Sequence, residues 1–252
     1  MQNPSPIELE TRGDVTLLRL AHGRVNALDL ELVRAFDAAL DEVEEAGAVV
    51  LTGRGSVFSA GVDLARVDAD PPEGLATFLV ELDALFRRLL LFSRPVVAAN
   101  NGHALAGGWV LACACDVRLV AAGEARLGVT ELAVGVPFPR SAFEAFRLAT
   151  PAPLVASLAL RARRLTVAEA AAHGLLDEVL SPEDLLPRAF EIAAEMAPMP
   201  SSAIAVTKRQ LRAGGLGSAE EDAAETFRHW NAPEARQRIR TFLASLAARP
   251  RG

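Results

Sequence analysis

The stretch RPVVAANNGHALAGGWVLACACDVRL, residues 94–119, decides the fold of this chain. Residues 96–99 follow Pro95 and predict a buried strand, because proline ends the helical pattern before it. A turn with several glycines comes next and runs into an apolar helix of small residues. Residues 117–121 predict a second strand. This succession of strand, helix and strand indicates an α/β fold.

The flanking sequence continues the pattern on the N-terminal side. Predicted before residue 94 are a hairpin over 7–20, a helix over 29–46 that Asp29 caps, a strand over 49–52, a glycine-rich loop over 53–61 and a helix over 75–92. Strands and helices therefore alternate along the first half of the chain.

After Glu131 the pattern becomes mostly helical. Thr166 and Glu169 form a capping box, which predicts a helix start, and Ser218 with Glu221 predicts another. A second start signal follows at Ser181. The segment PMPSS, residues 198–202, is the best candidate boundary. We expect a core domain over 1–197 and a C-terminal helical region over 198–252.

Composition limits the class of protein. Of the 252 residues, 51% are hydrophobic and 23% are charged, as in an ordinary globular protein. The formal net charge of −6 argues against nucleic acid as a partner, which favours a basic surface. Cys113 and Cys115 are too few and too close for a disulfide framework and predict buried free thiols. Because no signal pattern opens the chain and its apolar runs are too short to span a membrane, we expect a cytoplasmic protein without a membrane partner.

Several common site motifs are absent. The sequence has no phosphate-binding P-loop, no dinucleotide fingerprint, no nucleophile elbow and no zinc-protease motif. Its histidines have no metal-ligand spacing, so we expect no metal site. They are His22, His103, His173 and His229.

Two glycine-rich turns remain as candidates for chemistry. The first is FSAGVDL, residues 58–64, and the second is NGHALAGG, residues 101–108. Glycines at such turns permit tight bends and close packing, which is the plain structural interpretation. The second turn also leads into a helix, whose first backbone N–H groups have no intrahelical partner. Two amides converging on one point would form an oxyanion hole.

Four segments together resemble the crotonase, or enoyl-CoA hydratase/isomerase, superfamily. They are GRVNALD (23–29), VVLTGRGSVFSAGVDL (49–64), the stretch 94–119 and ARLGVTELAVGVPF (125–138). The resemblance implies a spiral of ββα units, a helical C-terminal region that forms trimers or hexamers, and an acyl-CoA thioester as substrate. It implies no further cofactor.

The family's site residues carry over by position. Its oxyanion amides fall on Val62 and Gly107, and one of the two hydratase glutamates falls on Glu131. The other glutamate position is Val110, which cannot transfer a proton. Together with the apolar VPFP segment, this pattern resembles the single-glutamate Δ3,Δ2-enoyl-CoA isomerases. Val110 and Phe138 are then expected in the acyl pocket.

The same resemblance places coenzyme A across two segments. The residues it implies are Arg24, Val25, Ala27, Ala60 and Leu64, with Phe227 reaching the ligand from the C-terminal helices.

Three functions stay open at this point. The first is an isomerase that moves a double bond from position 3 to position 2. The second is a hydratase or another crotonase reaction, with an acid supplied by Asp70 or Glu73. The third is an acyl-CoA-binding protein with little turnover, against which the retained Glu131 argues. An apolar C-terminal run predicts the trimer contact, although it could cap its own core. Its residues are Phe227, Trp230, Ile239, Phe242, Leu243 and Leu246.

Overall fold

The computed structural model describes residues 5–212, 227–228 and 230–247. Its larger sheet has six strands in the order β1-β2-β3-β5-β7-β10, and a smaller sheet has the order β4-β6-β8-β9. In the larger sheet the strands are β1 (Ile7–Arg12), β2 (Val15–Leu20), β3 (Ala48–Gly53), β5 (Val96–Asn100), β7 (Val117–Ala121) and β10 (Glu178–Leu180). In the smaller sheet they are β4 (Val57–Ser59), β6 (His103–Leu105), β8 (Arg126–Gly128) and β9 (Leu165–Thr166).

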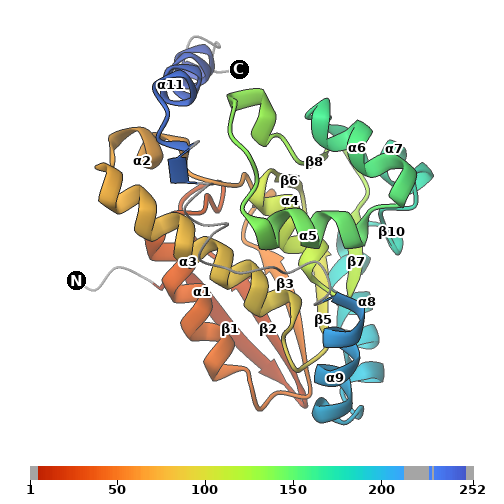
Figure 1. Ribbon diagram of the computed structural model, residues 1–252. Helices are drawn as coiled ribbons and strands as arrows, with labels where there is room; N and C mark the ends of the chain where they lie inside the picture. Colours follow the sequence, from red (N-terminus) through yellow and green to blue (C-terminus); the bar gives the residue numbers. More distant parts are fainter. Residues whose placement is uncertain (1–4, 213–226, 229, 248–252) are drawn as a thin grey trace.

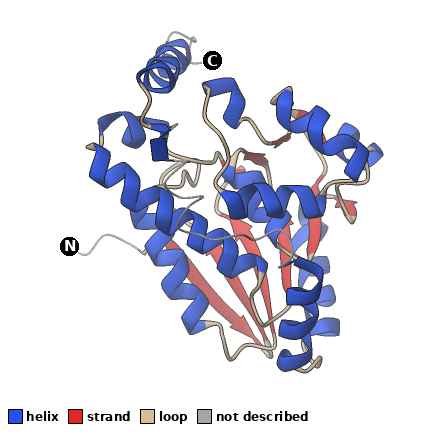
Figure 2. Ribbon diagram, viewed as in Figure 1, coloured by secondary structure: helices blue, strands red, loops and turns tan. Residues whose placement is uncertain are grey.

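Helices surround these sheets (Figure 1, Figure 2). The first half of the chain contributes α1 (Leu30–Glu42), α2 (Leu64–Ala69), α3 (Pro72–Leu90) and α4 (Gly107–Ala114). The second half contributes the 3₁₀ helix η1 (Glu131–Val134), then α5 (Arg140–Ala149), α6 (Ala152–Leu160), α7 (Val167–Ala172), α8 (Pro182–Met196), α9 (Ser201–Arg212) and α11 (Pro233–Ala247).

Successive side chains of a strand point to opposite sides of the sheet, and in the central strands β3 and β5 of the larger sheet both sides are buried, whereas the edge strand β1 is mostly exposed. In β3, Val49 and Leu51 join the main core with α1 and α3, whereas Val50 joins a second core. That second core is closed by Leu185 and Ala189 of α8. Because both faces are covered there, residues 96–99 of β5 are all apolar rather than alternating.

The smaller sheet positions the site. Its strands β4, β6 and β8 run parallel, so their C-terminal ends all lie at the same end of the sheet. β9 runs antiparallel to β8, so its N-terminus lies at that same end. Four chain segments meet there: the loop after Ser59, the turn before α4, the segment leading into η1 and the segment before β9.

The structure confirms an α/β fold and most predicted elements. The hairpin, the capping box of Thr166 and Glu169, and the cap at Ser181 are present. The helix capped by Asp29 ends at Glu42 rather than near residue 46. Residues 44–47 instead turn back, so that the Gly47 N–H donates to the Asp14 oxygen at 2.8 Å and β3 starts beside β2.

The capping box predicted at Ser218 and Glu221 lies outside the described residues, as does His229. Within the residues that the structure covers, no helix is long and apolar enough to cross a membrane.

Candidate active site

A single cavity contains most of the predicted chemistry. It encloses about 710 Å³, including the part open to solvent, and lies where the segments from the smaller sheet converge. Most of its wall is apolar, with Leu82, Phe86, Val134, Val136 and Pro139 among the lining residues. Gly107, Val62 and Glu131 line the same cavity. The tertiary fold thus brings together three residues that are far apart in sequence.

Gly61 allows the two glycine-rich turns to touch. Its φ of +83° is a backbone conformation that favours glycine, and a Cβ atom there would lie 2.6 Å from the Leu105 oxygen. It would also lie 3.1 Å from the Gly107 nitrogen. Any side chain at position 61 would therefore push the two turns apart.

The backbone amides of Val62 and Gly107 are available for a ligand. Among the described residues, neither N–H has a hydrogen-bond partner. Gly107 opens α4, and the preceding Ala106 accepts from the N–H groups of Trp109 and Val110. Ala106 has φ +48° and ψ −127°, a strained conformation for a residue with a side chain. Strain of this kind at the start of a helix is consistent with a turn that holds an amide toward the cavity.

Glu131 is a buried carboxylate in the cavity wall. Glu131 is the first residue of η1, and its exposed fraction is 6%. Among the described residues, its Oε2 has no hydrogen-bond partner. Burial raises the pKa of Glu131 from 4.5 to about 7, and backbone N–H groups of Glu131 and Thr130 oppose the rise. A carboxyl group with a pKa near 7 can both accept and return a proton at neutral pH.

The segments predicted to hold coenzyme A lie side by side. The Ala60 N–H donates to the Val25 oxygen at 3.0 Å, and the Ser59 hydroxyl donates to the Asn26 oxygen at 2.7 Å. Arg24 and Val25 are exposed, while Ala27 is half-buried. Ala60 and Leu64 also line the cavity. These predicted residues therefore form one continuous strip that runs from the surface to the cavity.

Three predicted residues lie elsewhere. Val110 is fully buried in the main core, one helical turn after Gly107, and is not part of the cavity wall. Phe138 packs instead against Phe143 and Phe146, with ring centroids 5.6 and 6.4 Å away. Phe227 is half-buried against the main core and does not line the cavity. The apolar lining of this segment comes from the neighbouring Val136 and Pro139 instead.

The other proposed acids are also outside the wall. Asp70 ends α2 and lines a separate, smaller pocket, and Glu73 is exposed in the first turn of α3. Among the described residues, Glu131 is the only carboxylate that lines the main cavity.

The C-terminal helix closes the cavity of its own chain. Trp230 and Phe242 line the cavity, and the Trp230 indole N–H donates to the Pro137 oxygen at 3.1 Å. Ile239 is fully buried in the main core, whereas Leu246 is 46% exposed. Figure 1 shows α11 standing beside α2. Most of the apolar run that predicts a subunit contact therefore packs within the chain, and the trimer stays a prediction.

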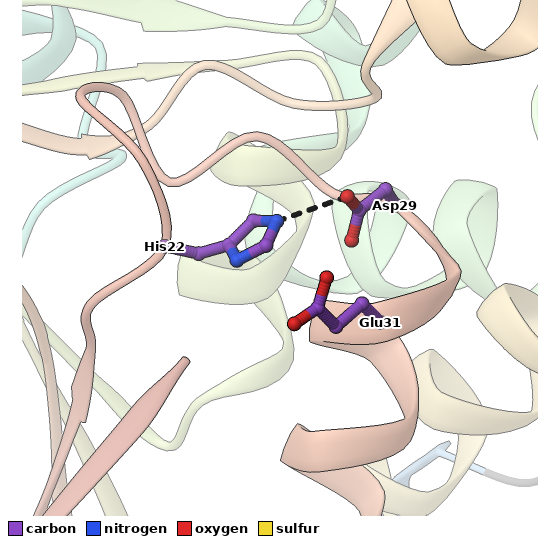
Figure 3. A group of neighbouring side chains, drawn as sticks. All are labelled: His22, Asp29 and Glu31. Atoms are coloured by element: carbon purple, nitrogen blue, oxygen red, sulfur yellow. Dashed lines mark hydrogen bonds and ion pairs between the residues drawn. The ribbon is translucent and has the colours of Figure 1, made fainter. Parts of the chain in front are cut away.

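One group of possible metal ligands occurs among the described residues. His22, Asp29 and Glu31 present donor atoms that lie within 4.8 Å of one another (Figure 3). The His22 Nε2 lies 2.9 Å from Asp29 Oδ2, and Asp29 Oδ1 accepts from the Leu32 N–H at 2.9 Å. Asp29 thus caps α1 and braces His22, which accounts for both residues without an ion. Spacing along the sequence did not reveal this group, because His22 and Asp29 are joined by a loop.

Sequence reasoning missed two polar residues of the wall, Thr130 and Arg164. Thr130 directly precedes Glu131, so its position in the cavity wall could have been predicted from that neighbour. Arg164 is one of many arginines, and no local pattern distinguishes it from the others.

Comparison with known proteins shows the family of this chain. The model of the enoyl-CoA hydratase/isomerase family matches residues 10–235. A putative enoyl-CoA hydratase from Thermus thermophilus is 38% identical over 201 residues, covering 77% of this chain and 79% of that protein. A solved Mycobacterium tuberculosis protein, called an enoyl-CoA isomerase in one structure and a probable enoyl-CoA hydratase in another, is 31% identical in the first structure with a TM-score of 0.80, covering 88% and 97% of the two chains.

Human mitochondrial Δ3,Δ2-enoyl-CoA isomerase has a TM-score of 0.90 at 23% identity, over 96% of this chain and 98% of that one, and shows the shared fold. With the family match spanning most of its length and its cavity built from the family's segments, this chain belongs to the enoyl-CoA hydratase/isomerase family.

Proposed function

We propose that this enzyme shifts the double bond of a 3-enoyl-CoA to position 2. The observation that carries the proposal is the single buried carboxylate, Glu131, in an otherwise largely apolar cavity wall of the described residues. Isomerisation moves one proton between two carbons of the same substrate. One carboxylate that reaches both carbons is enough for that task.

The reaction has two proton transfers. Ionised Glu131 removes a proton from C2, and the electron pair moves onto the thioester carbonyl to give a dienolate. The N–H groups of Val62 and Gly107 stabilise the negative oxygen, each worth about 3–4 kcal/mol in the transition state. Protonated Glu131 then returns the proton at C4, which leaves the conjugated 2-enoyl-CoA and the ionised carboxylate.

A hydratase is the second candidate, because the Thermus thermophilus relative carries that name. Hydration needs a positioned water and a proton donor for C2, which is the usual reason for two carboxylates. Asp70 and Glu73 lie outside the cavity wall, so they do not supply the second one. The apolar wall also disfavours a bound water molecule. These features support isomerisation over hydration.

The experiment is to offer 3-hexenoyl-CoA and 2-hexenoyl-CoA separately and to identify the products. We expect conversion of the first compound and little hydration of the second. E131Q should lose isomerisation by several orders of magnitude while still binding hexanoyl-CoA. E124Q, at an exposed carboxylate outside the cavity, is the matched control and should retain full rate. Rapid hydration by the natural enzyme, or isomerisation by E131Q at the natural rate, contradicts the proposal.

We also propose that the enzyme works as a homotrimer, or as a hexamer of two trimers, in the cytoplasm. The support is the family to which the chain belongs. Light scattering at micromolar concentration tests the assembly, and a monomer would contradict it.

A further inference from the structure

Arg164 adds a positive charge to the wall of the acyl cavity. It lies just before β9 and is exposed, yet it lines the same cavity as Glu131. Among the described residues, its guanidinium has no hydrogen bond and no ion pair. Arg163, its neighbour, is by contrast held by Glu169 at 3.1 Å. Arg164 therefore has guanidinium donors that no other described residue uses, in a residue that lines the cavity.

The strand register places Arg164 relative to the reacting centre. Arg126 pairs with Thr166 and Leu127 with Leu165, so Gly128 faces Arg164 in the continued register. A Cβ atom at Gly128 would lie 3.7 Å from the Arg164 Cα, which agrees with that pairing. Gly128 pairs on its other side with Leu105, two residues before Gly107. Arg164 thus stands two strand spacings, roughly 10 Å, from the strand that leads to the oxyanion turn.

The strip predicted to hold coenzyme A lies at the other side of this sheet. Ala60 and Leu64 follow β4, and Arg164 precedes β9, and these two strands are the opposite edges of the four-stranded sheet. A thioester held at Val62 and Gly107 would have its nucleotide on the β4 side. Its acyl chain would then extend toward the side of the cavity where Arg164 stands.

Arg164 and Glu131 do not neutralise each other. Glu131 Oε2 has no hydrogen-bond partner among the described residues, and no ion pair joins the two side chains. The cavity wall therefore contains the acid–base group Glu131 and, separately, the cation Arg164, which pairs with no described acid. Among its described lining residues these are the only charged ones.

We propose that Arg164 binds a carboxylate at the far end of the acyl chain, so that the enzyme prefers dicarboxylic acyl-CoA substrates. A guanidinium matches a carboxylate with two parallel hydrogen bonds, which a plain alkyl end cannot offer. This inference rests on the proposed function, since it requires an acyl-CoA in the cavity.

The test measures binding of saturated thioesters, which can be neither isomerised nor hydrated. Titration calorimetry compares hexanoyl-CoA with adipoyl-CoA, and butanoyl-CoA with succinyl-CoA, to cover two chain lengths. We expect the dicarboxylic member of at least one pair to bind about tenfold more tightly, a typical effect of a hydrogen-bonded charge discounted for solvent. R164M should remove that preference, so that the two members of the pair bind with equal affinity, and R164K should restore part of it.

The matched control is R161Q, because Arg161 is exposed, belongs to the same segment and does not line the cavity. It should keep the preference. Equal loss of affinity for both members of a pair in R164M would place Arg164 on the coenzyme and overturn the inference. Equal binding of both members by the natural enzyme also overturns it, while the proposed function stands. If no acyl-CoA binds at all, the proposed function itself fails.

Discussion

The ionisation of Glu131 sets the pH range of the proposed reaction. Burial raises its pKa to about 7, and the first step requires the ionised form. We therefore expect kcat/KM for a 3-enoyl-CoA to rise with pH, to reach half its maximum near pH 7, and to fall about tenfold per pH unit well below that. A pH–rate profile that stays flat down to pH 5 would contradict this assignment of the base.

The same shift affects stability. Because the folded state raises the pKa of Glu131 above 4.5, the ionised carboxylate destabilises the fold at pH 8, and this penalty disappears as the pH falls through 7 toward 4.5. The difference between a pKa of 4.5 and one of about 7 corresponds to a loss of roughly 3 kcal/mol of folding stability at most. E131Q should therefore be more stable than the natural protein at pH 8 and lose that advantage by pH 4.5. Urea unfolding at both pH values measures the difference, and an advantage independent of pH would contradict it.

Gly61 is a further test at the scale of a single residue. G61A places a methyl group 2.6 Å from the Leu105 oxygen and forces a positive φ on alanine, so it should displace the Val62 amide and lower kcat at least tenfold. The control G55A has the same backbone strain, with φ +80°, but its methyl group points into open space. G55A should lose about 1 kcal/mol of stability through the strained backbone alone, and G61A should lose more, because its methyl group also meets backbone atoms. Equal activities of the two variants would contradict the role of the turn.

Among the elements, α11 is bound to the end of α2 by several hydrogen bonds of Arg236. Arg236 donates to the backbone oxygens of Val67, Asp68 and Asp70, which satisfies carbonyl groups at the end of that helix. Since α11 also carries Phe242 into the cavity, this contact holds one wall of the site in place.

R236M should loosen α11. We expect a stability loss of about 1–3 kcal/mol, faster hydrogen exchange over residues 233–247, and a KM for acyl-CoA that rises more than kcat falls. The matched control is R240M, because Arg240 makes a single long contact of 3.6 Å with Asp68 and is half exposed. Unchanged hydrogen exchange in R236M would show that α11 is held by its apolar contacts alone.

At the scale of the whole molecule, Asp116 connects the C-terminal helices to the core. Its carboxylate binds Lys208 of α9 at 2.7 Å and Arg212 at 2.8 Å, and it accepts from the Val96 N–H of β5 at 2.7 Å. Lys208 is 5% exposed, and burial lowers its pKa while Asp116 opposes that change. Among the described residues, Asp116 is the only acid that pairs with these two cations.

D116N should therefore destabilise the protein by about 3–5 kcal/mol, because it leaves buried positive charge without a counter-ion. E178Q, which breaks the more exposed pair with Arg188, should cost under about 1 kcal/mol. Chemical denaturation measures both changes, and similar losses in the two variants would contradict a special role for Asp116.

Local signals in the sequence determined much of this molecule. Apolar runs located β3, β5 and β7, and weak alternation around a turn located the hairpin of β1 and β2. Asp29, Thr166 and Ser181 marked helix starts, since each cap depends on residues at most three positions away. The glycine turns and Glu131 were placed through a resemblance carried by contiguous motifs. Short β9, with two residues, carries too little pattern to be predicted.

Contacts between distant residues decided the rest. The pKa of Glu131 is raised because several elements bury its carboxylate. The free amides of Val62 and Gly107 lie at one cavity because Gly61 lets the two turns meet at Leu105. Arg164 lies in the cavity wall because of the register of β9 against β8. Val110 does not line the cavity, because the packing of α4 places its side chain in the main core. Its spacing from Gly107 along the sequence could not show this. Helix caps and strand runs act over a few neighbouring residues, whereas burial, register and cavity shape are properties of side chains that meet only when the chain has folded.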